Sequence, residues 1–291
     1  MQHRVVRIRV AGSTSLEVPL LELPGASGGG GGFAWDASRA LAAYLVRDVG
    51  AAQLAGRSVL ELGAGLGLPG LVAARLDARR VTLTDRARAL ELLGRNAASA
   101  GIDVASSAGA DIASSAGADV VAAAEFDFGS ALRRLPAGTL PVDVLLMSDL
   151  LGLDSSIYAP LVKTLDDLDR NRAAASAGAG EGSGAAAAGG ARLRMIMSYR
   201  RRAAFEEGFF ELLAERGFAC RVARVFAATR ATAGERELDV DADADALPCR
   251  EEAWREPVSI LEIERRGRGD AADAPAPLLG DEMPLSRRGE A

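Results

Sequence analysis

An apolar segment that runs directly into alternating glycines limits the folds open to this chain. Ser58–Leu62 reads SVLEL, and Gly63, Gly65 and Gly67 follow at every second position before Pro69. Glycine tolerates positive φ and lets the backbone come close to a ligand, whereas proline is favoured in the first turn of a helix. The pattern predicts a buried strand, a tight turn and a helix, which is the repeating unit of an α/β sheet.

Strand and helix patterns go on alternating from residue 58 to residue 216. This alternation predicts a doubly wound, mostly parallel sheet with helices on both faces. The last two expected strands have no helix between them, so we expect that pair to be antiparallel. Two short segments near the first residue are expected to pair as a hairpin. The expected strands cover residues 4–10, 15–20, 58–62, 80–84, 142–147, 193–199, 219–226 and 258–264, and the expected helices cover 36–47, 69–76, 86–100, 158–168 and 202–216.

Low-complexity segments interrupt this pattern. The chain has 33 glycines among 291 residues, where a usual share of ~7% would give about 20. Many lie in residues 172–191 and in 25–32 (GASGGGGG), which reads as a flexible linker. The sequence DVASSAGA recurs as DIASSAGA at 111–118, a period too short for a repeat fold. We therefore expect N-terminal strands in 1–24, the linker, one domain in 33–265 with insertions near 103–120, 171–191 and 228–250, and a disordered tail in 266–291.

The composition excludes several kinds of site. His3 is the only histidine, and Cys220 and Cys249 are the only cysteines. A histidine-based zinc site, a Ser-His-Asp triad and a disulfide framework are therefore excluded, and we expect no bound metal. The formal net charge of −6 argues against a nucleic-acid partner. No apolar run is long enough for a membrane span or a signal peptide, so we expect no membrane partner and a cytoplasmic location, with a nuclear pool left open.

The glycine turn fits two kinds of nucleotide-like ligand. Gly65-x-Gly67-x-x-Gly70 has the form of the dinucleotide fingerprint GxGxxG, but it begins two residues after the strand ends. Gly63-x-Gly65-x-Gly67 lies flush with the strand end instead, and a plain strand-to-helix turn is the third interpretation. Asp85, at the end of the next expected strand, supports a nucleoside, because a carboxylate there can accept hydrogen bonds from both ribose hydroxyls.

A wider set of motifs resembles one enzyme family. Gly63-x-Gly65-x-Gly67 resembles motif I of the class I S-adenosylmethionine-dependent methyltransferases, and the chain resembles the seven-β-strand protein-lysine methyltransferases of the methyltransferase-like 21 family. The matching segments, in chain order, are 32–37 (GFAWDA), 61–65 (ELGAG), Thr84-Asp85 with Asn96, Asp127-Phe128-Gly129, 143–149 (DVLLMSD), 197–201 (MSYRR), and Phe205, Phe209 and Phe210 with Gly217-Phe218. Each piece alone is common, whereas the ordered set is specific.

This resemblance implies a fold, an activity and a set of site residues. The fold is α/β and Rossmann-like, a seven-stranded, mostly parallel sheet with an antiparallel last strand pair. The activity is methyl transfer from S-adenosyl-L-methionine to a lysine side chain of a protein. The implied cofactor contacts are Gly63, Ala64 and Gly65 along the methionine and ribose, Asp85 on the ribose, Phe128 against the adenine, Trp35 as a cover, and Ser148 through its backbone. Trp35 and Phe128 could instead be core aromatics.

The acceptor site departs from the family pattern. The family has a tyrosine three positions after the aspartate of its D-x-x-Y motif, but here Gly152 stands three positions after Asp149. Tyr158 lies six residues further along and is expected in the next helix. Asp149 is the candidate catalytic residue, because its carboxylate can orient a substrate amine by hydrogen bonds. The missing tyrosine removes an aromatic wall and a hydroxyl group.

Other functions stay open at the level of sequence. A binding module that keeps the cofactor fold without catalysis is one, and Gly152 suggests it. A small-molecule methyltransferase would share the cofactor site and differ in its acceptor pocket, and a nicotinamide-dependent oxidoreductase could use the same glycine turn. The shortage of histidine is compatible with methyl transfer, which depends on positioning and desolvation. We expect the protein to be a monomer.

Overall fold

The structure is a computed structural model that describes residues 1–9, 15–23, 32–100, 104–106, 120–151, 154–178, 192–230, 239–241, 246–249 and 256–266. Four features expected from the sequence lie outside these residues. They are the linker apart from Gly32, most of the eight-residue repeat, Gly152, and the tail from residue 267 onward. No helix within the described ranges is long and apolar enough to cross a membrane.

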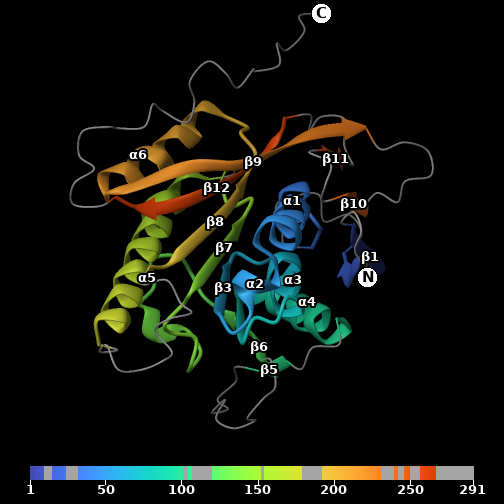
Figure 1. Ribbon diagram of the computed structural model, residues 1–291, viewed down its shortest axis with the longest axis horizontal. Helices are drawn as coiled ribbons and strands as arrows, with labels where there is room; N and C mark the ends of the chain where they lie inside the picture. The colour runs from blue at the N-terminus through green and yellow to red at the C-terminus, as the bar shows by residue number, and fades with distance from the viewer. Residues whose placement is uncertain are drawn as a thin grey trace, which may run out of the picture.

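The described residues form one large sheet of nine strands and a smaller sheet of three (Figure 1). The large sheet has the order β11-β9-β12-β8-β7-β3-β4-β6-β5. Its strands are β3 (Ser58–Leu62), β4 (Arg80–Asp85), β5 (Val104–Ser106), β6 (Val120–Glu125), β7 (Val144–Ser148), β8 (Arg194–Tyr199), β9 (Phe218–Arg230), β11 (Ala246–Cys249) and β12 (Val258–Arg265).

The expected mixed sheet is confirmed. Strands β5, β6, β4, β3, β7 and β8 each run parallel to the next strand in this order, whereas β12 runs antiparallel to both β8 and β9. The seven strands from β6 to β9 in the sheet order therefore form the Rossmann-like unit with its antiparallel end. The short strands β5 and β11 extend this unit by one strand at each edge.

Helices cover both faces of the large sheet (Figure 1). One face carries α1 (Asp36–Tyr44), α3 (Leu68–Arg75) and α4 (Ala87–Ser99), and the other carries α5 (Tyr158–Gly178) and α6 (Glu207–Glu215). Shorter helices are the π-helix η1 (Leu45–Val49), α2 (Gly50–Leu54), and the 3₁₀ turns η2 (Leu132–Arg134), η3 (Ser155–Ile157) and η4 (Ala204–Glu206).

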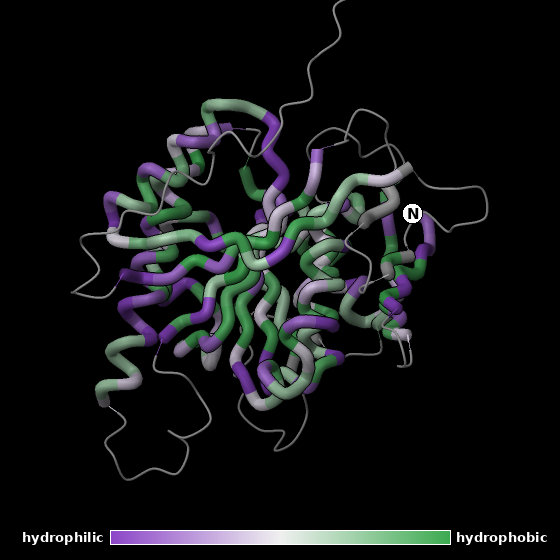
Figure 2. Tube along the Cα trace, turned by 45° about the horizontal axis from the view of Figure 1, so that its top comes forward, coloured by the Kyte–Doolittle hydropathy of each residue, from purple (hydrophilic) through white to green (hydrophobic). Residues whose placement is uncertain are grey.

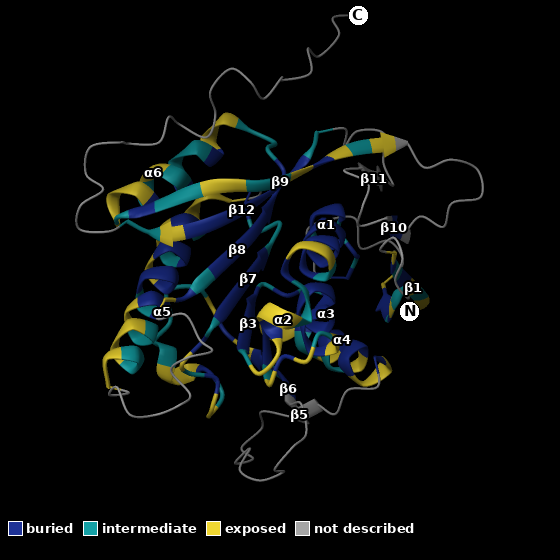
Figure 3. Cartoon of the chain, in the orientation of Figure 1, coloured by how far each residue is buried: buried dark blue, intermediate teal, exposed yellow. Residues whose placement is uncertain are grey.

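The central strands are buried on both faces, as a covered parallel sheet requires. On β7, Val144 and Leu146 pack toward α1 and α3, whereas Leu145 and Met147 pack toward α5 and α6. Figure 2 shows these strands as hydrophobic along their length, and Figure 3 shows β3, β7 and β8 as almost wholly buried. The apolar run VLLM at 144–147 fits this setting, whereas a strand with one solvent-exposed face would alternate apolar and polar residues.

The expected N-terminal hairpin is confirmed and belongs to the smaller sheet. Strands β1 (Gln2–Arg9) and β2 (Leu16–Glu22) are antiparallel, and β10 (Asp239–Asp241) pairs with β1 in parallel. The buried Asn96 side chain of α4 fastens this hairpin. Its Oδ1 accepts from the Leu21 N–H at 2.6 Å, and its Nδ2 donates to Leu66 O at 3.2 Å. One amide thus joins the hairpin to the glycine turn.

Two helices differ in extent from the sequence expectation. The helix expected over 36–47 is α-helical only to Tyr44 and continues as a π-helix. Helix α5 continues to Gly178, so the first part of the 172–191 segment is helical and not a loop. Arg172 explains part of this extension, because its guanidinium forms an ion pair of 3.0 Å with Asp143 before β7.

Candidate functional site

The predicted site residues gather at the carboxyl edge of the parallel strands. The glycine turn follows β3, Asp85 ends β4, Phe128 follows β6, and Ser148 ends β7 with Asp149 directly after it. In an open α/β sheet, ligands bind in the crevice outside these strand ends. The sheet order places β3 between β4 and β7, so the turn lies between the two acidic residues.

A hydrogen bond joins the glycine turn to Asp85. Gly63 and Gly65 have left-handed φ angles of 61° and 56°. The Gly65 N–H donates to Asp85 Oδ2 at 2.8 Å, and the Arg86 N–H donates to Oδ1 at 2.7 Å. A carboxylate offers about four lone-pair positions, so each oxygen of this half-exposed side chain can still accept another donor.

Gly67 and Gly70 have packing roles, which corrects the expectation that Gly67 makes room for a ligand. A Cβ on Gly67 would lie 2.7 Å from Leu93 Cδ1 and 3.1 Å from Leu83 Cδ1, which are core atoms. A Cβ on Gly70 would lie 2.2 Å from Leu83 Cδ2 and 2.7 Å from Glu61 Oε2. Both glycines therefore let α3 lie close to β4 and α4.

Glu61 is a fully buried carboxyl group beneath the turn. Its Oε2 accepts from the Gly70 N–H at 2.8 Å, and its Oε1 has no hydrogen-bond partner among the described residues. Burial raises the pKa of Glu61 to about 8; the hydrogen bond from Gly70 opposes this shift, and the charge of Asp85 adds to it. Glu61 is therefore mostly neutral at pH 7 and can donate a proton in a hydrogen bond.

Phe128 lies beside Gly63. A ring that contacts a cofactor bound over the turn would need this position. A Cβ on Gly63 would lie 3.6 Å from Phe128 Cζ and 2.5 Å from Leu150 Cδ2. The Phe128 ring is half-buried against the core on the α5 side. The missing side chain of Gly63 thus admits the two apolar groups that follow β6 and β7.

Trp35 precedes α1 and is half-buried, with its ring edge-on to Phe33 at 5.4 Å between centroids. The next residue, Asp36, is buried and accepts from Arg39, and also from Arg200 at 2.9 Å. Burial alone would raise the pKa of Asp36, but the two guanidinium groups hold it below its ordinary value. This contact fixes the Trp35 segment to the end of β8.

Asp149 has a conformation that few non-glycine residues adopt, with a φ of 56°. Its N–H donates to Ser198 O at 3.1 Å, which continues the pairing of β7 with β8. Its Oδ2 accepts from Arg202 Nη2 at 2.6 Å. Ser148, the last residue of β7, is the register partner of Ser198.

Tyr158 does not replace the missing tyrosine of the D-x-x-Y motif. It begins α5, as expected, and it is buried with its ring edge-on to Phe209 at 5.8 Å between centroids. Tyr199, at the end of β8, donates instead to the buried Glu206 at 2.6 Å. Burial and then the hydrogen bond to Glu206 raise the pKa of Tyr199, so its hydroxyl stays protonated.

Residues 197–201 (MSYRR) match the family pattern, but no role was predicted for Arg200 or for Arg202, which directly follows this segment. The structure shows that Arg200 contacts Asp36 and that Arg202 contacts Asp149. A run of arginines directly after a buried strand was the available signal, because a charged group at a strand end lies at the ligand-binding edge. Their partners could not be named, since they lie 164 and 53 residues away.

Among the described residues, possible metal ligands and one further pocket can be compared with this site. No group of three or more His, Cys, Asp or Glu side chains suited to a metal occurs among the residues described. A pocket of about 390 Å³ lies at the opposite edge of the sheet, where β8 begins and β12 ends, and no predicted site residue lines it. Its charged walls pair with each other, with Arg194 on Glu262 at 2.7 Å and Arg265 on Asp169.

Comparison with known proteins places these features in one family. The sequence model of a family described as lysine methyltransferase matches residues 25–177, which is more than half of the chain. A mouse relative, protein N-lysine methyltransferase METTL21A, is 55% identical over 62 residues, which are 21% of this chain and 27% of the relative. The protein N-terminal and lysine N-methyltransferase EFM7 of Eremothecium gossypii is 33% identical over 163 residues, 56% of this chain and 55% of the relative.

The chain thus matches about a quarter of METTL21A and about half of EFM7. Among solved structures, the T. thermophilus 16S rRNA N2 G1207 methyltransferase RsmC overlaps 91% of this chain and 51% of its own, with 17% identity and a TM-score of 0.47. The family model spans the Trp35 segment, the glycine turn, Asp85, Phe128 and Asp149. The chain belongs to the lysine methyltransferase family.

Proposed function

We propose that this protein transfers a methyl group from S-adenosylmethionine to a lysine side chain of another protein. The observation that carries the proposal is the placement of Asp85 and Asp149 on either side of the glycine turn, at one edge of the sheet, in a chain of this family. One carboxylate lies where a ribose is bound in α/β folds, and the other lies where an acceptor amine could reach the same turn.

The residues present fit S-adenosylmethionine. Gly63 and Gly65 have left-handed φ angles, and with Ala64 they form the turn that would follow the methionine and ribose. Asp85 keeps acceptor capacity for ribose hydroxyls, because each of its oxygens accepts one hydrogen bond from the part of the chain that the structure describes. Phe128 offers an apolar ring beside Gly63. Trp35 would cover the cofactor, and Ser148 would contact it through its backbone.

When bound, S-adenosylmethionine supplies a methyl group on a positively charged sulfur, and the lone pair of an amine nitrogen takes that carbon while the electrons of the S–C bond stay on sulfur. The protein has to align the amine and exclude water. Asp149 would accept a hydrogen bond from the amine and so direct its lone pair. The nitrogen gives up its extra proton to solvent, and no metal is required.

The test is methyl labelling in an extract. Wild type and Asp85→Asn are incubated with a cell extract and tritium-labelled S-adenosylmethionine, and the labelled residue is identified by mass spectrometry. We expect wild type to label a lysine of an extract protein and Asp85→Asn to lose most of this label. Lys163, half-exposed on α5, is the only lysine of the chain. Lys163→Arg is therefore the control that removes self-methylation.

Each alternative function predicts a different outcome in this labelling experiment or in binding titrations with S-adenosylhomocysteine and NAD. Label on a small molecule and on no protein would favour small-molecule methylation. Binding of S-adenosylhomocysteine without any label would favour a non-catalytic module. Binding of NAD in place of S-adenosylhomocysteine would favour an oxidoreductase. A cytoplasmic location and a monomeric state are parts of the same proposal, and cell fractionation and analytical ultracentrifugation check them.

A further inference from the structure

Arg202 connects the loops that leave β7 and β8 beside the candidate acceptor site. Its Nη2 donates to Asp149 Oδ2 at 2.6 Å. Its Nη1 donates to Leu151 O and to Arg200 O, each at 3.3 Å. A planar guanidinium can hold several acceptors in fixed directions, which a lysine ammonium cannot do. The Arg202 head group is therefore fixed on Asp149 and on the backbone at either side.

The backbone of Arg202 is held as firmly as its head group. Its N–H donates to Glu206 Oε2 at 2.9 Å, and Tyr199 donates to the same oxygen at 2.6 Å. Glu206 is fully buried, so this anchor is shielded from water. Burial keeps the pKa of Tyr199 above its ordinary value, so this donor persists through the pH range of an assay.

The second oxygen of Asp149 is open to a donor. Asp149 Oδ1 is buried and has no hydrogen-bond partner within the described ranges. The side chain is only 10% exposed, so water reaches it poorly. A buried acceptor without a partner is unfavourable and favours the binding of a group that donates to it. An amine N–H is such a donor.

We propose that Arg202 is a positioning residue that aims Asp149 Oδ1 at the acceptor amine and offsets the charge of Asp149, so that the amine is bound in its neutral form. This inference rests on the proposed function. An isolated carboxylate beside a lysine stabilises the ammonium form, which has no lone pair to donate. The guanidinium that neutralises the carboxylate removes this penalty and keeps the hydrogen-bond acceptor.

The neighbouring charged groups are already engaged elsewhere. Arg200 binds Asp36 at 2.9 Å, and Arg201 binds Glu207 at 2.6 Å. Glu206 accepts from Tyr199 and from the Arg202 backbone. From α5, the buried Tyr158 packs on Phe209, and across the glycine turn Asp85 accepts from Gly65. Among the residues that the structure describes, Arg202 is therefore the cation that contacts the Asp149 carboxylate.

The test compares Arg202→Gln with Arg202→Lys, and Arg201→Gln is the matched control. Arg201 is the adjacent arginine, and its ion pair with Glu207 leaves Asp149 untouched. The turnover rate at saturating substrate is measured from pH 6.5 to 10 on the extract protein that wild type labels. This rate reports ionisation in the bound complex. Calorimetric binding of S-adenosylhomocysteine shows that each variant is folded and keeps its cofactor site.

We expect Arg202→Gln to shift the acid limb of this profile upward by about one pH unit, which means about tenfold lower turnover at pH 7.5 and recovery near pH 9.5. Arg202→Lys should keep the wild-type profile at a reduced rate, and Arg201→Gln should match wild type. S-adenosylhomocysteine affinity should stay within about twofold in all three variants.

An activity-independent measurement accompanies the profile. The unfolding midpoints of Asp149→Asn, Arg202→Gln and the double variant should be non-additive, because the two side chains contact each other. A pH-independent loss of turnover in Arg202→Gln, or additive midpoints, would overturn the role of Arg202 while the proposed function stands. A wild-type protein that labels nothing would overturn both. If Arg202→Gln does not fold, the pH profile of Arg202→Lys decides. An upward shift of about one pH unit in Arg202→Lys, which keeps the positive charge, would contradict the proposal that the charge of Arg202 matters.

Discussion

At the scale of single residues, glycines that look alike in the sequence serve different purposes. Gly63 leaves room for Leu150 and Phe128, whereas Gly67 and Gly70 accommodate core leucines. The distinction matters for mutagenesis, because an alanine at each position meets a different obstacle. At Gly63 both the left-handed φ of 61° and the contact with Leu150 oppose a side chain.

The substitution Gly63→Ala should weaken both stability and cofactor binding. A left-handed alanine costs about 1–2 kcal/mol, and the new methyl group would lie 2.5 Å from Leu150 Cδ2. We expect the free energy of unfolding to fall by about 2 kcal/mol and the affinity for S-adenosylhomocysteine to fall by about tenfold or more. Denaturant titration and calorimetry measure the two effects.

Gly94→Ala is the matched control for this change. Gly94 lies inside α4, where a new Cβ would have no heavy atom within 4 Å. Alanine is favoured over glycine in a helix by about 1 kcal/mol, so this variant should be as stable as wild type or more stable. Equal losses in the two variants would contradict the role assigned to the turn.

Glu61 makes the stability of the fold depend on pH. Its pKa in the folded state, about 8, exceeds its ordinary value of 4.5 because the group is buried. A raised pKa stabilises the fold fully below the unfolded pKa, and this contribution is lost as the pH rises toward 8. Wild type should therefore lose on the order of a few kcal/mol of unfolding free energy between pH 5 and pH 8.

The variant Glu61→Gln should remove most of the pH dependence of the unfolding free energy, because an amide does not ionise in this range. The amide oxygen can still accept the hydrogen bond from Gly70. Urea titrations at pH 5, 6.5 and 8 measure the difference. His3 is the only histidine, so few other side chains titrate in this range. If the unfolding free energies of wild type and Glu61→Gln changed equally with pH, the Glu61 carboxyl would not be the cause of the pH dependence.

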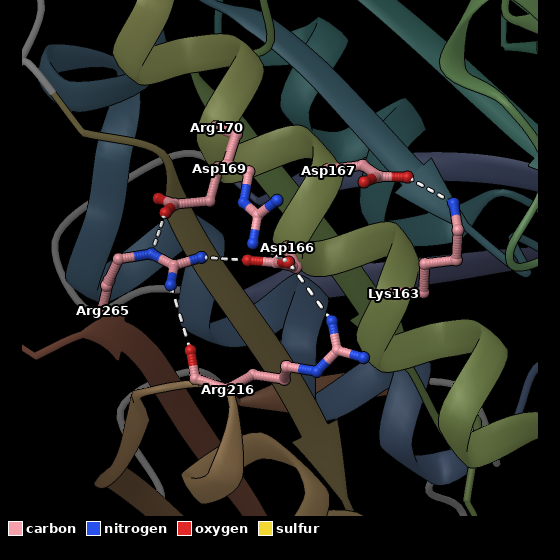
Figure 4. A network of polar contacts seen from close by, with 7 residues as sticks. All are labelled: Lys163, Asp166, Asp167, Asp169, Arg170, Arg216 and Arg265. Atoms are coloured by element: carbon pink, nitrogen blue, oxygen red, sulfur yellow. Dashed lines mark hydrogen bonds and ion pairs between the residues drawn. The ribbon is translucent and has the colours of Figure 1, made fainter.

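At the scale of elements, helix α5 is attached to the rest of the fold by a buried carboxylate (Figure 4). Asp166 is 2% exposed and accepts from Arg265 of β12, and it pairs with Arg216, which follows α6, and with Arg170 of α5 itself. Arg265 also binds Asp169. The network joins α5 to the residue that follows α6 and to the end of β12.

The change Asp166→Asn should lower the free energy of unfolding by about 2 kcal/mol, because it leaves guanidinium groups without the buried charge that they share. Arg170 and Arg216 are more than half exposed, so water compensates part of the loss. Asp167→Asn is the control on the same helix. Asp167 pairs with the half-exposed Lys163 (Figure 4), and its loss should cost less than about 0.5 kcal/mol. Chemical denaturation compares the two, and similar losses would contradict the importance of the network.

At the scale of the whole molecule, ligand binding is expected to stabilise the fold by mass action. The site joins the ends of β3, β4, β6 and β7, so unfolding destroys it entirely. At a ligand concentration of 100 times Kd the gain is about 2.7 kcal/mol, which corresponds to a rise in Tm of about 5–10 °C in a chain of this size. Differential scanning calorimetry should show this rise with S-adenosylhomocysteine and no rise with NAD.

Asp85→Asn tests where this stabilisation comes from. Its carboxylate holds the Gly65 N–H even without ligand, so the variant itself is expected to melt at a lower temperature than wild type. The informative quantity is therefore the ligand-induced rise in each protein and not the midpoint itself. We expect the rise to be at most half that of wild type. An undiminished rise would remove Asp85 from the cofactor site.

Most of the fold could be predicted from local sequence, and the failures have a common cause. The strand at 58–62, its turn and the helix after it were predictable, because each depends on neighbouring residues. Strand β6, which reads VVAAAE, was not predicted, since alanine has a low preference for strands. Its strand conformation comes from pairing with β4 over six residues, from Arg80–Val120 to Asp85–Glu125.

The candidate site divides in the same way. Sequence alone determined that a buried strand meets a glycine turn, that Asp85 and Asp149 end strands, and that the sheet is mostly parallel, because these features follow from the order and spacing of residues. Tertiary structure alone decided that Leu150 and Phe128 flank Gly63, and that Arg202 holds Asp149. Such partners are set by which strand ends the sheet order brings together, and a side chain can reach a distant partner only after the chain has closed the intervening loop.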